Sequence, residues 1–131
     1  MITRFFIYGF SGWVTEVFWT GISAAFKGDI NMTGHTSVWM FWIYAFCGIL
    51  FEPIYKNIKQ HSIFTRGCIW TVLIFSAEAL SGFFLRFFGI EAWKYETLLS
   101  VYGLIRLDYL PAWFLVGLLY EKLNNKLLYD L

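Results

Sequence analysis

Two glutamates stand inside long apolar stretches of the chain, where ionisable groups are rare. Glu16 follows Arg4 by twelve residues, and Glu78 follows Arg66 by twelve. Twelve residues of helix measure about 18 Å, which places each carboxyl past the middle of a hydrocarbon layer about 30 Å thick. A carboxyl at that depth faces the interior of a helix bundle, pairs, or stays protonated. Glu16 and Glu78 are therefore our candidate groups for binding a proton or a cation.

Small residues share a helix face with each glutamate, which favours a packed position between helices. They lie three, four or seven positions away: Gly9 and Gly12 before Glu16, and Ser81 and Gly82 after Glu78. We expect both carboxyls to point into the seam of a bundle and, if the halves of the chain are symmetric, to face each other. The alternative role is structural: a protonated carboxyl that joins two helices by a hydrogen bond.

Three further charged residues would gather at the outer surface. Arg86, Arg106 and Asp108 are additional candidates for binding a substrate or an ion. Their structural alternative is an ion pair of Asp108 with either arginine. Arg86 lies eight residues beyond Glu78, which is about 12 Å along a helix, so a direct pair within one helix is disfavoured.

Four residues are secondary candidates for the site. Glu52 and Glu121 lie near the cytoplasmic ends of their apolar stretches, within reach of lysines, and we expect interfacial charges that extend toward water. Trp93 and Tyr95 stand beside charges and suit an anchor at the level of lipid headgroups. The segment 89–102, which contains them, either lies on the membrane surface or folds back as a lid over the helices.

The composition indicates a membrane protein. Of 131 residues, 59% are hydrophobic and only 15% are charged, whereas soluble domains average about 25% charged residues. Four stretches are long enough to cross a bilayer as helices, at about 5–26, 36–55, 63–88 and 103–123. Strands are disfavoured because these stretches lack period-two alternation. We expect an all-α integral membrane protein whose residues 1–131 form a single bundle of four transmembrane helices.

Positive charges predict the orientation of this bundle. With the N-terminus inside, six lysines and arginines face the cytoplasm and four face the other side. We therefore expect both termini in the cytoplasm and, in a bacterium, a location in the cytoplasmic membrane. A signal peptide is disfavoured because the first apolar stretch is too long and contains Glu16.

The two halves of the chain resemble each other, although apolar helices also resemble one another by chance. The matching positions are Arg4, Ile7, Tyr8 and Glu16 with Arg66, Ile69, Trp70 and Glu78, and Gly48 and Glu52 with Gly117 and Glu121. The stretches run in the same direction in both halves. This pattern predicts two helical hairpins related by an axis along the membrane normal.

Several classes of function find no support in the sequence. Cys47 and Cys68 favour neither a disulfide nor a metal site, and His35 and His61 lie in different connections. We see no Ser/His/Asp set for an enzyme and no phosphate-binding loop for an ATPase, so we expect no catalytic residue, metal or cofactor. The net charge of +1 without a basic tract argues against binding to nucleic acid.

The chain resembles the small multi-pass family of transmembrane protein 229, which is grouped with bacterial proteins described as ABC-transporter type IV permeases. The residues that carry the resemblance are Gly12-Trp13, Glu16, Gly34 to Phe41, Glu52, Arg66-Gly67, Glu78, Ser81-Gly82, Leu85-Arg86, Gly103 to Ile105, Leu107 to Tyr109, Pro111, Trp113 and Glu121. One segment departs: Glu91-Ala-Trp-Lys-Tyr95 stands where the family tends to have Cys-Pro-Trp-Asp-Tyr. The resemblance implies a polytopic membrane protein, and permease is the role by which the bacterial members of the family are described.

Two functional hypotheses follow. The first is a small permease or channel-like transport component in which Glu16 and Glu78 bind a proton or a cation. Because four helices make a narrow bundle and the chain has no ATPase motif, a homodimer or a separate transporter subunit would complete such a path. The second is a membrane protein that binds lipid or a partner without transport, with the two glutamates in a structural role.

Overall fold

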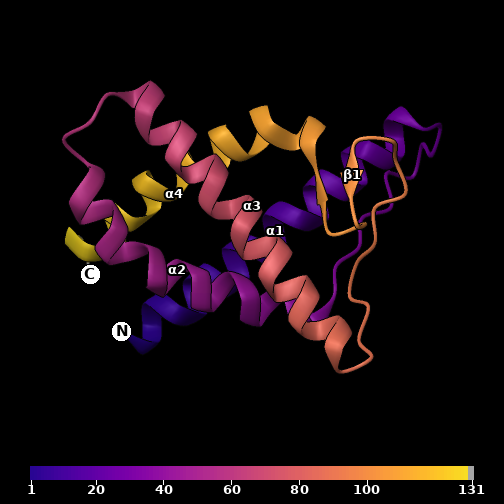
Figure 1. Ribbon diagram of the computed structural model, residues 1–131, viewed down its shortest axis with the longest axis horizontal. Helices are drawn as coiled ribbons and strands as arrows, with labels where there is room; N and C mark the ends of the chain where they lie inside the picture. Colours follow the sequence, from indigo (N-terminus) through magenta and orange to yellow (C-terminus); the bar gives the residue numbers. More distant parts are fainter. Residues whose placement is uncertain (130–131) are drawn as a thin grey trace. The chain divides into compact units, whose positions relative to one another are not determined.

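Helices make up most of the chain in the computed structural model, which describes residues 1–129 (Figure 1). A helical content of 73% confirms the prediction of an all-α protein. The helices are α1 (Ile2–Phe26), α2 (Val38–Ile58), α3 (Ile63–Phe87) and α4 (Leu110–Tyr129). Two short strands, β1 (Ser100–Val101) and β2 (Ile105–Arg106), and a 3-10 turn, η1 (Leu107–Tyr109), lie between α3 and α4.

The chain divides into two compact units, Met1–Phe51 and Glu52–Leu131. The first unit contains α1 and most of α2. The second contains the last turns of α2 together with α3, the strands and α4. Each unit has its own buried apolar side chains, with Phe41 and Ala45 among those of the first and Trp70 and Leu104 among those of the second.

Glycines bring α1 and α2 into close contact in the first unit. A Cβ added to Gly9 would lie 2.5 Å from the ring of Phe41, and one added to Gly48 would overlap the ring of Tyr8. Atoms do not approach so closely, so these rings lie directly on bare backbone. The predicted packed face of the first apolar stretch is therefore confirmed at Gly9.

The connection between α1 and α2 is held by its own polar groups. The carboxylate of Asp29 accepts hydrogen bonds from the backbone N–H groups of Asn31 at 3.0 Å and Thr33 at 3.1 Å. Hydrogen bonds from Thr33 and Asn31 lower the pKa of Asp29 below its ordinary value. Gly28, with φ of +100°, supplies the left-handed conformation at which α1 ends.

Glycines also bring α3 and α4 together in the second unit. A Cβ on Gly67 of α3 would overlap the ring of Phe114, and one on Gly117 of α4 would overlap Trp70. Trp70 has no exposed surface. The contact of Trp70 with Gly117 matches that of Tyr8 with Gly48, and these are the positions that the internal repeat equates. One contact thus recurs in both units.

The fourth helix begins later than the sequence predicted. Residues 103–109 were expected inside a helical stretch, but they form part of a hairpin and a 3-10 turn, and α4 starts at Leu110. β1 and β2 pair antiparallel, and the turn between them places Tyr102 and Gly103 at φ of +54° and +69°. A right-handed helix cannot include residues with left-handed backbone, so no helical run passes through this turn.

Both prolines lie inside helices, in different ways. Pro111 is in the first turn of α4, where a missing backbone N–H costs nothing. Pro53 does not end α2, which continues to Ile58. Its ring removes the backbone donor that would normally reach the carbonyl of Ile49.

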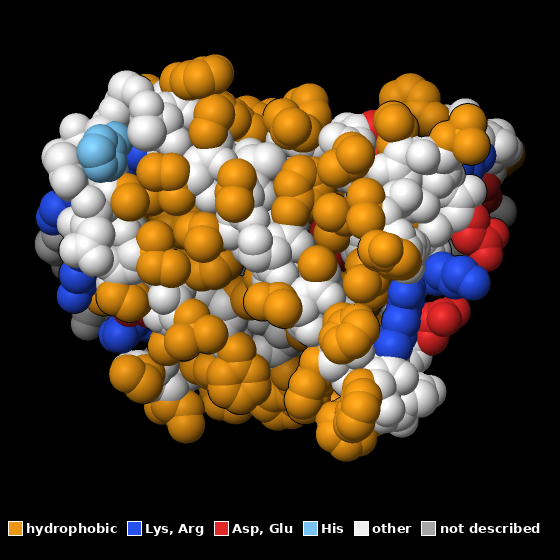
Figure 2. All heavy atoms as spheres, in the orientation of Figure 1, with side chains coloured by type: hydrophobic (Ala, Val, Ile, Leu, Met, Phe, Trp, Pro, Cys, Tyr) orange, Lys and Arg blue, Asp and Glu red, His pale blue; other side chains and the backbone are white. Residues whose placement is uncertain are grey.

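Much of the apolar surface of the chain is exposed. Hydrophobic side chains predominate over charged ones on the face shown in Figure 2. On α3, Leu80, Phe83 and Phe87 are 72%, 67% and 78% exposed. Two helices, α2 and α3, are long and apolar enough to cross a membrane, and only 28% and 22% of their apolar windows are buried. The core helix of a soluble protein would be mostly buried, so their exposure favours a membrane environment.

Candidate functional site

Glu16 lies where α1 meets α2 in the first unit. Its Oε2 accepts a hydrogen bond of 3.0 Å from the phenol of Tyr44 on α2. The ring of Tyr44 rests on Gly12, where a Cβ would overlap it. Gly12 and Glu16 are one helical turn apart, so the glycine admits the ring whose hydroxyl then reaches the carboxyl. The sequence predicted that these two residues share a packed face, and this is confirmed.

Further hydrogen bonds fix the start of α2 against α1. The indole of Trp13 donates to the carbonyl of Ser37 at 2.9 Å. The hydroxyl of Thr20 accepts a hydrogen bond of 2.8 Å from the backbone N–H of His35. These two contacts flank Glu16 along α1 and hold the chain leading into α2, so the position of Tyr44 does not depend on a single bond.

Glu78 lies near the middle of α3, and its hydrogen-bond donor comes from the connection between α3 and α4. The phenol of Tyr95 donates a hydrogen bond of 2.6 Å to its Oε1. Tyr95 belongs to the segment 89–109 that joins α3 to α4 (Figure 1). Residues of the segment 89–102 contact α3, as expected for a segment that folds back over the helices. Both glutamates of the apolar stretches therefore accept a hydrogen bond from a tyrosine.

Gly82 holds this segment against α3, one turn beyond Glu78. A Cβ on Gly82 would lie 2.8 Å from the indole ring of Trp93 and 2.6 Å from the side chain of Leu104. The indole N–H of Trp93 donates to the carbonyl of Leu104 at 2.9 Å. The predicted face formed by Glu78 and Gly82 is thus covered by Trp93 and Tyr95.

The observed hydrogen bonds of Arg86 go to backbone carbonyls and not to a carboxylate. Its guanidinium donates to the carbonyls of Tyr102 at 2.6 Å, Trp93 at 3.2 Å and Gly103 at 3.3 Å. Of the two ion pairs that the sequence left open for Asp108, the one with Arg106 is formed, at 2.6 Å. Arg86 instead connects the end of α3 to both limbs of the segment that follows it.

Arg106 lies at the centre of an aromatic and acidic cluster. Its guanidinium carbon is 4.4 Å from the ring centroid of Tyr109 and 6.0 Å from that of Tyr95, and its Nη1 donates to the Tyr109 hydroxyl at 3.0 Å. The hydrogen bond and charge of Arg106 lower the pKa of Asp108 below its ordinary value. The rings of Tyr95 and Tyr109 meet edge to face at 5.6 Å. Contacts therefore run continuously from exposed Asp108 to Glu78.

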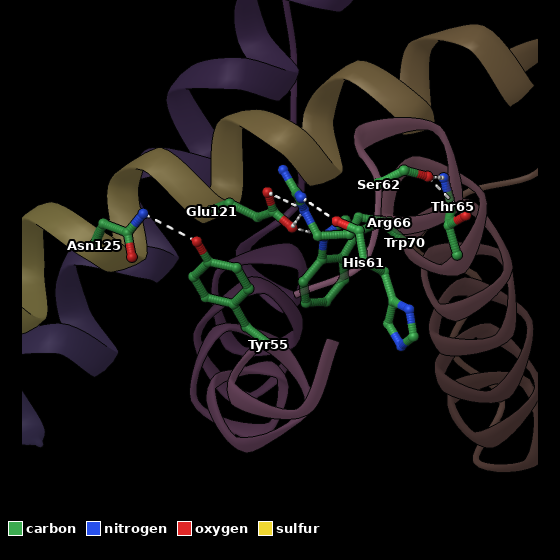
Figure 3. Close-up of polar contacts among 8 residues, drawn as sticks. All are labelled: Tyr55, His61, Ser62, Thr65, Arg66, Trp70, Glu121 and Asn125. Carbon is green, nitrogen blue, oxygen red and sulfur yellow. Dashed lines mark hydrogen bonds and ion pairs between the residues drawn. The ribbon is translucent and has the colours of Figure 1, made fainter. Parts of the chain in front are cut away.

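A second cluster lies at the other end of α3 and α4 (Figure 3). Arg66 donates from Nε to both oxygens of Glu121, at 3.1 and 3.0 Å, and Trp70 donates its indole N–H to the same carboxylate at 2.8 Å. Nη1 of Arg66 donates to the carbonyl of His61 at 2.6 Å. Nearby, Asn125 of α4 donates to the hydroxyl of Tyr55 at 3.0 Å.

The expectation that Glu52 and Glu121 extend toward water was wrong. Glu121 is only 5% exposed, because Arg66 and Trp70 supply the donors that a buried carboxylate needs. Glu52 is 8% exposed, although it stands near the end of α2. Among residues 1–129, no three His, Cys, Asp or Glu side chains gather in a way that could hold a metal ion.

Sequence reasoning missed three contributors to these sites. Tyr44, the partner of Glu16, is one of many aromatic residues and carries no distinguishing pattern. Arg66 and Trp70 were not recognised as partners of Glu121, although their spacing of four places them on one helix face. A comparison with known proteins finds no family model and no solved structure that matches the chain.

Proposed function

We propose that this chain is a multi-pass membrane protein whose four helices all cross the bilayer. The lengths of α1 and α4, 25 and 20 residues, support this, since about 20 helical residues span a hydrocarbon layer. The exposed apolar side chains on α1, among them Phe10 at 53% and Phe18 at 67%, would contact lipid chains. Both termini would lie in the cytoplasm, as the charge distribution favours.

Within this membrane protein, we propose a small permease or channel-like transport component that binds a proton or a small cation at Glu78 and Glu16. The observation that carries the proposal is the continuous line of side chains from exposed Asp108, through Arg106 and the paired tyrosines, to Glu78. Because Asp108 neutralises the charge of Arg106, the line does not present a bare positive charge to an incoming cation.

The hydrogen bond to Glu78 supplies a partner for a carboxyl in an apolar helix. The phenol of Tyr95 lies 2.6 Å from Oε1 of Glu78, which is within hydrogen-bonding distance. A carboxyl that can lose its proton inside an apolar helix is the group that a proton or cation pathway requires. The resemblance to the family of transmembrane protein 229 supports the same role, with a homodimer or a separate subunit completing the path.

The second candidate is a membrane protein that binds lipid or a partner and transports nothing. The observation that favours it is that each glutamate already bonds a tyrosine, Glu16 across two helices and Glu78 across a helix and its connection. Such bonds stabilise packing in a membrane whether or not an ion passes.

Flux through purified protein in liposomes separates the two candidates. With an imposed gradient of protons or of a small monovalent cation, the unaltered protein should dissipate the gradient and Glu78→Gln should not, because glutamine cannot ionise. Glu96→Gln is the matched control, since Glu96 is an exposed carboxylate of the same unit. Absence of flux in the unaltered protein, or full flux in Glu78→Gln, would favour the structural role.

A further inference from the structure

We infer that Arg86 is a positioning residue that holds residues 89–109, here named the cap, closed over Glu78. The inference rests on the proposed role of Glu78 as an ion-binding group. It adds that access to this carboxyl from the C-terminal end of α3 is controlled by the contact of Arg86 with the cap.

Arg86 joins parts of the cap that are distant in sequence. The carbonyls that it binds belong to Trp93, which leads into the cap, and to Tyr102 and Gly103, which form its hairpin turn. Tyr102 and Gly103 both have left-handed backbone, which turns the hairpin at this point. The guanidinium therefore fixes the two limbs of the cap relative to each other and to α3.

Within the cap, Arg86 and Tyr95 share a hydrogen-bond acceptor. The backbone N–H of Tyr95 donates to the carbonyl of Gly103 at 2.9 Å, and the same carbonyl accepts from Arg86. Tyr95 is thus one hydrogen bond away from the group that Arg86 holds. Its phenol extends to Glu78, two helical turns before Arg86 along α3.

Gly82 supplies the second contact surface of the cap. The indole of Trp93 rests on bare backbone at Gly82, between the levels of Glu78 and Arg86 on α3. Trp93 and Tyr95 are two residues apart, so docking of the indole brings the phenol toward the carboxyl. Tyr95 and Trp93 together cover the part of α3 that presents Glu78.

An arginine is suited to this task and a lysine is much less so. The planar guanidinium has five N–H donors in fixed directions, and Arg86 uses two of its nitrogens for three carbonyls. A lysine ammonium is a compact donor on a flexible stem and would hold fewer of these acceptors at once. Arg86→Lys should therefore keep part of the contact between α3 and the cap, and Arg86→Gln should lose most of it.

Chemical modification of Glu78 tests whether Arg86 holds the cap closed, and it does not require a transport assay. Protein in liposomes is treated with a water-soluble carbodiimide, and adducts on Glu78 and Glu16 are quantified by mass spectrometry of their peptides. Glu16 is the internal reference because its partner, Tyr44, lies in α2 and not in the cap. Arg86→Gln and Tyr95→Phe should each raise modification of Glu78 severalfold relative to Glu16, with Arg86→Lys intermediate and Glu96→Gln unchanged.

Two results would overturn the inference. One is unchanged modification of Glu78 in both Arg86→Gln and Tyr95→Phe. The other is a rise at Glu78 matched by an equal rise at Glu16, which would indicate general loosening of the protein. If Arg86→Gln does not fold, Arg86→Lys and Tyr95→Phe carry the same test. If modification of Glu78 rises selectively but no cation flux is seen, the inference about the cap stands and transport is refuted. If flux depends on Glu78 but modification is unchanged, only the inference about the cap is refuted.

Discussion

Trp70 and Glu121 are joined across α3 and α4 by a hydrogen bond of 2.8 Å from the indole N–H to the carboxylate. Trp70 has no exposed surface, and the carboxylate also accepts from Nε of Arg66. The side chain of Glu121 is 6% exposed and that of Arg66 is 18% exposed. Burial of this charge depends on all its donors, because an ion removed from water without partners costs several kcal/mol.

Removal of one member of the Arg66–Glu121 pair should destabilise the protein more than removal of both. Glu121→Leu leaves the guanidinium without its counter-ion, a change that costs about 3–5 kcal/mol in fully buried pairs and less here because Arg66 is partly exposed. The double variant Arg66→Met/Glu121→Leu should recover much of the lost stability. Thermal unfolding in detergent measures both. A double variant no more stable than Glu121→Leu would contradict this account.

The recurring contact between an aromatic ring and a glycine predicts that the two units respond alike to substitution. Gly117→Ala would drive a methyl group into Trp70, and Gly48→Ala would drive one into Tyr8. Overpacking of this kind costs about 1–3 kcal/mol, partly offset by about 1 kcal/mol from the higher helix propensity of alanine. Thermal unfolding should show both variants destabilised, and Leu119→Ala, at a 61% exposed position of α4, nearly unaffected. A loss of stability in only one glycine variant would argue against equivalent packing.

The sequence predicted the helices well because their signal is local. Long apolar runs bounded by charges and turn residues gave α3 to within one residue at each end and gave the end of α1, which starts three residues earlier than expected. The start of α4 was misplaced because residues 103–109 are apolar enough to resemble the beginning of a helix. Residues 103–109 instead belong to a hairpin and a 3-10 turn. The hairpin turns through left-handed backbone at Tyr102, a conformation that the presence of a tyrosine does not predict.

The candidate site could be predicted only in part, for the same reason. The faces containing Glu16 and Glu78 were recognisable because small residues stand one turn away on the same helix. The partners of the charged groups were not, because they are distant in sequence: Arg66 and Glu121 are 55 residues apart. The acceptors of Arg86 are backbone carbonyls, which every residue carries, so composition gives no sign of them.

The proposed topology predicts which connections are accessible from each side of the membrane. In a background where Cys47 and Cys68 are replaced by alanine, a cysteine at Asn57 should react with an impermeant reagent only from the cytoplasm. Cysteines at Asn31 and Glu96 should react only from outside. A cysteine at Leu131, which lies outside the described residues, should react from the cytoplasm. Reaction of Asn31 and Asn57 positions from the same side would contradict four spans.

The last prediction separates an ion-binding role of Glu78 from a structural one by the pair Glu78→Gln and Glu78→Leu. The amide of glutamine keeps the size of the side chain and accepts the hydrogen bond from Tyr95, so Glu78→Gln should retain stability in either role. Leucine cannot accept that bond, so Glu78→Leu should lose about 1–2 kcal/mol, the worth of an interhelical hydrogen bond in model membrane peptides.

The two roles of Glu78 then diverge in activity. If Glu78 binds a proton or cation, Glu78→Gln should be folded and inactive, because glutamine cannot ionise. Thermal stability of both variants, measured beside their ability to restore growth of a strain that lacks the protein, reads out the two properties separately. Tyr95→Phe is the matched control for loss of the hydrogen bond alone, since it removes the donor and leaves the carboxyl able to ionise. A stable Glu78→Gln variant that restores growth fully would mean that ionisation of this carboxyl is not needed, and Glu78 would then serve only to hold the cap on α3.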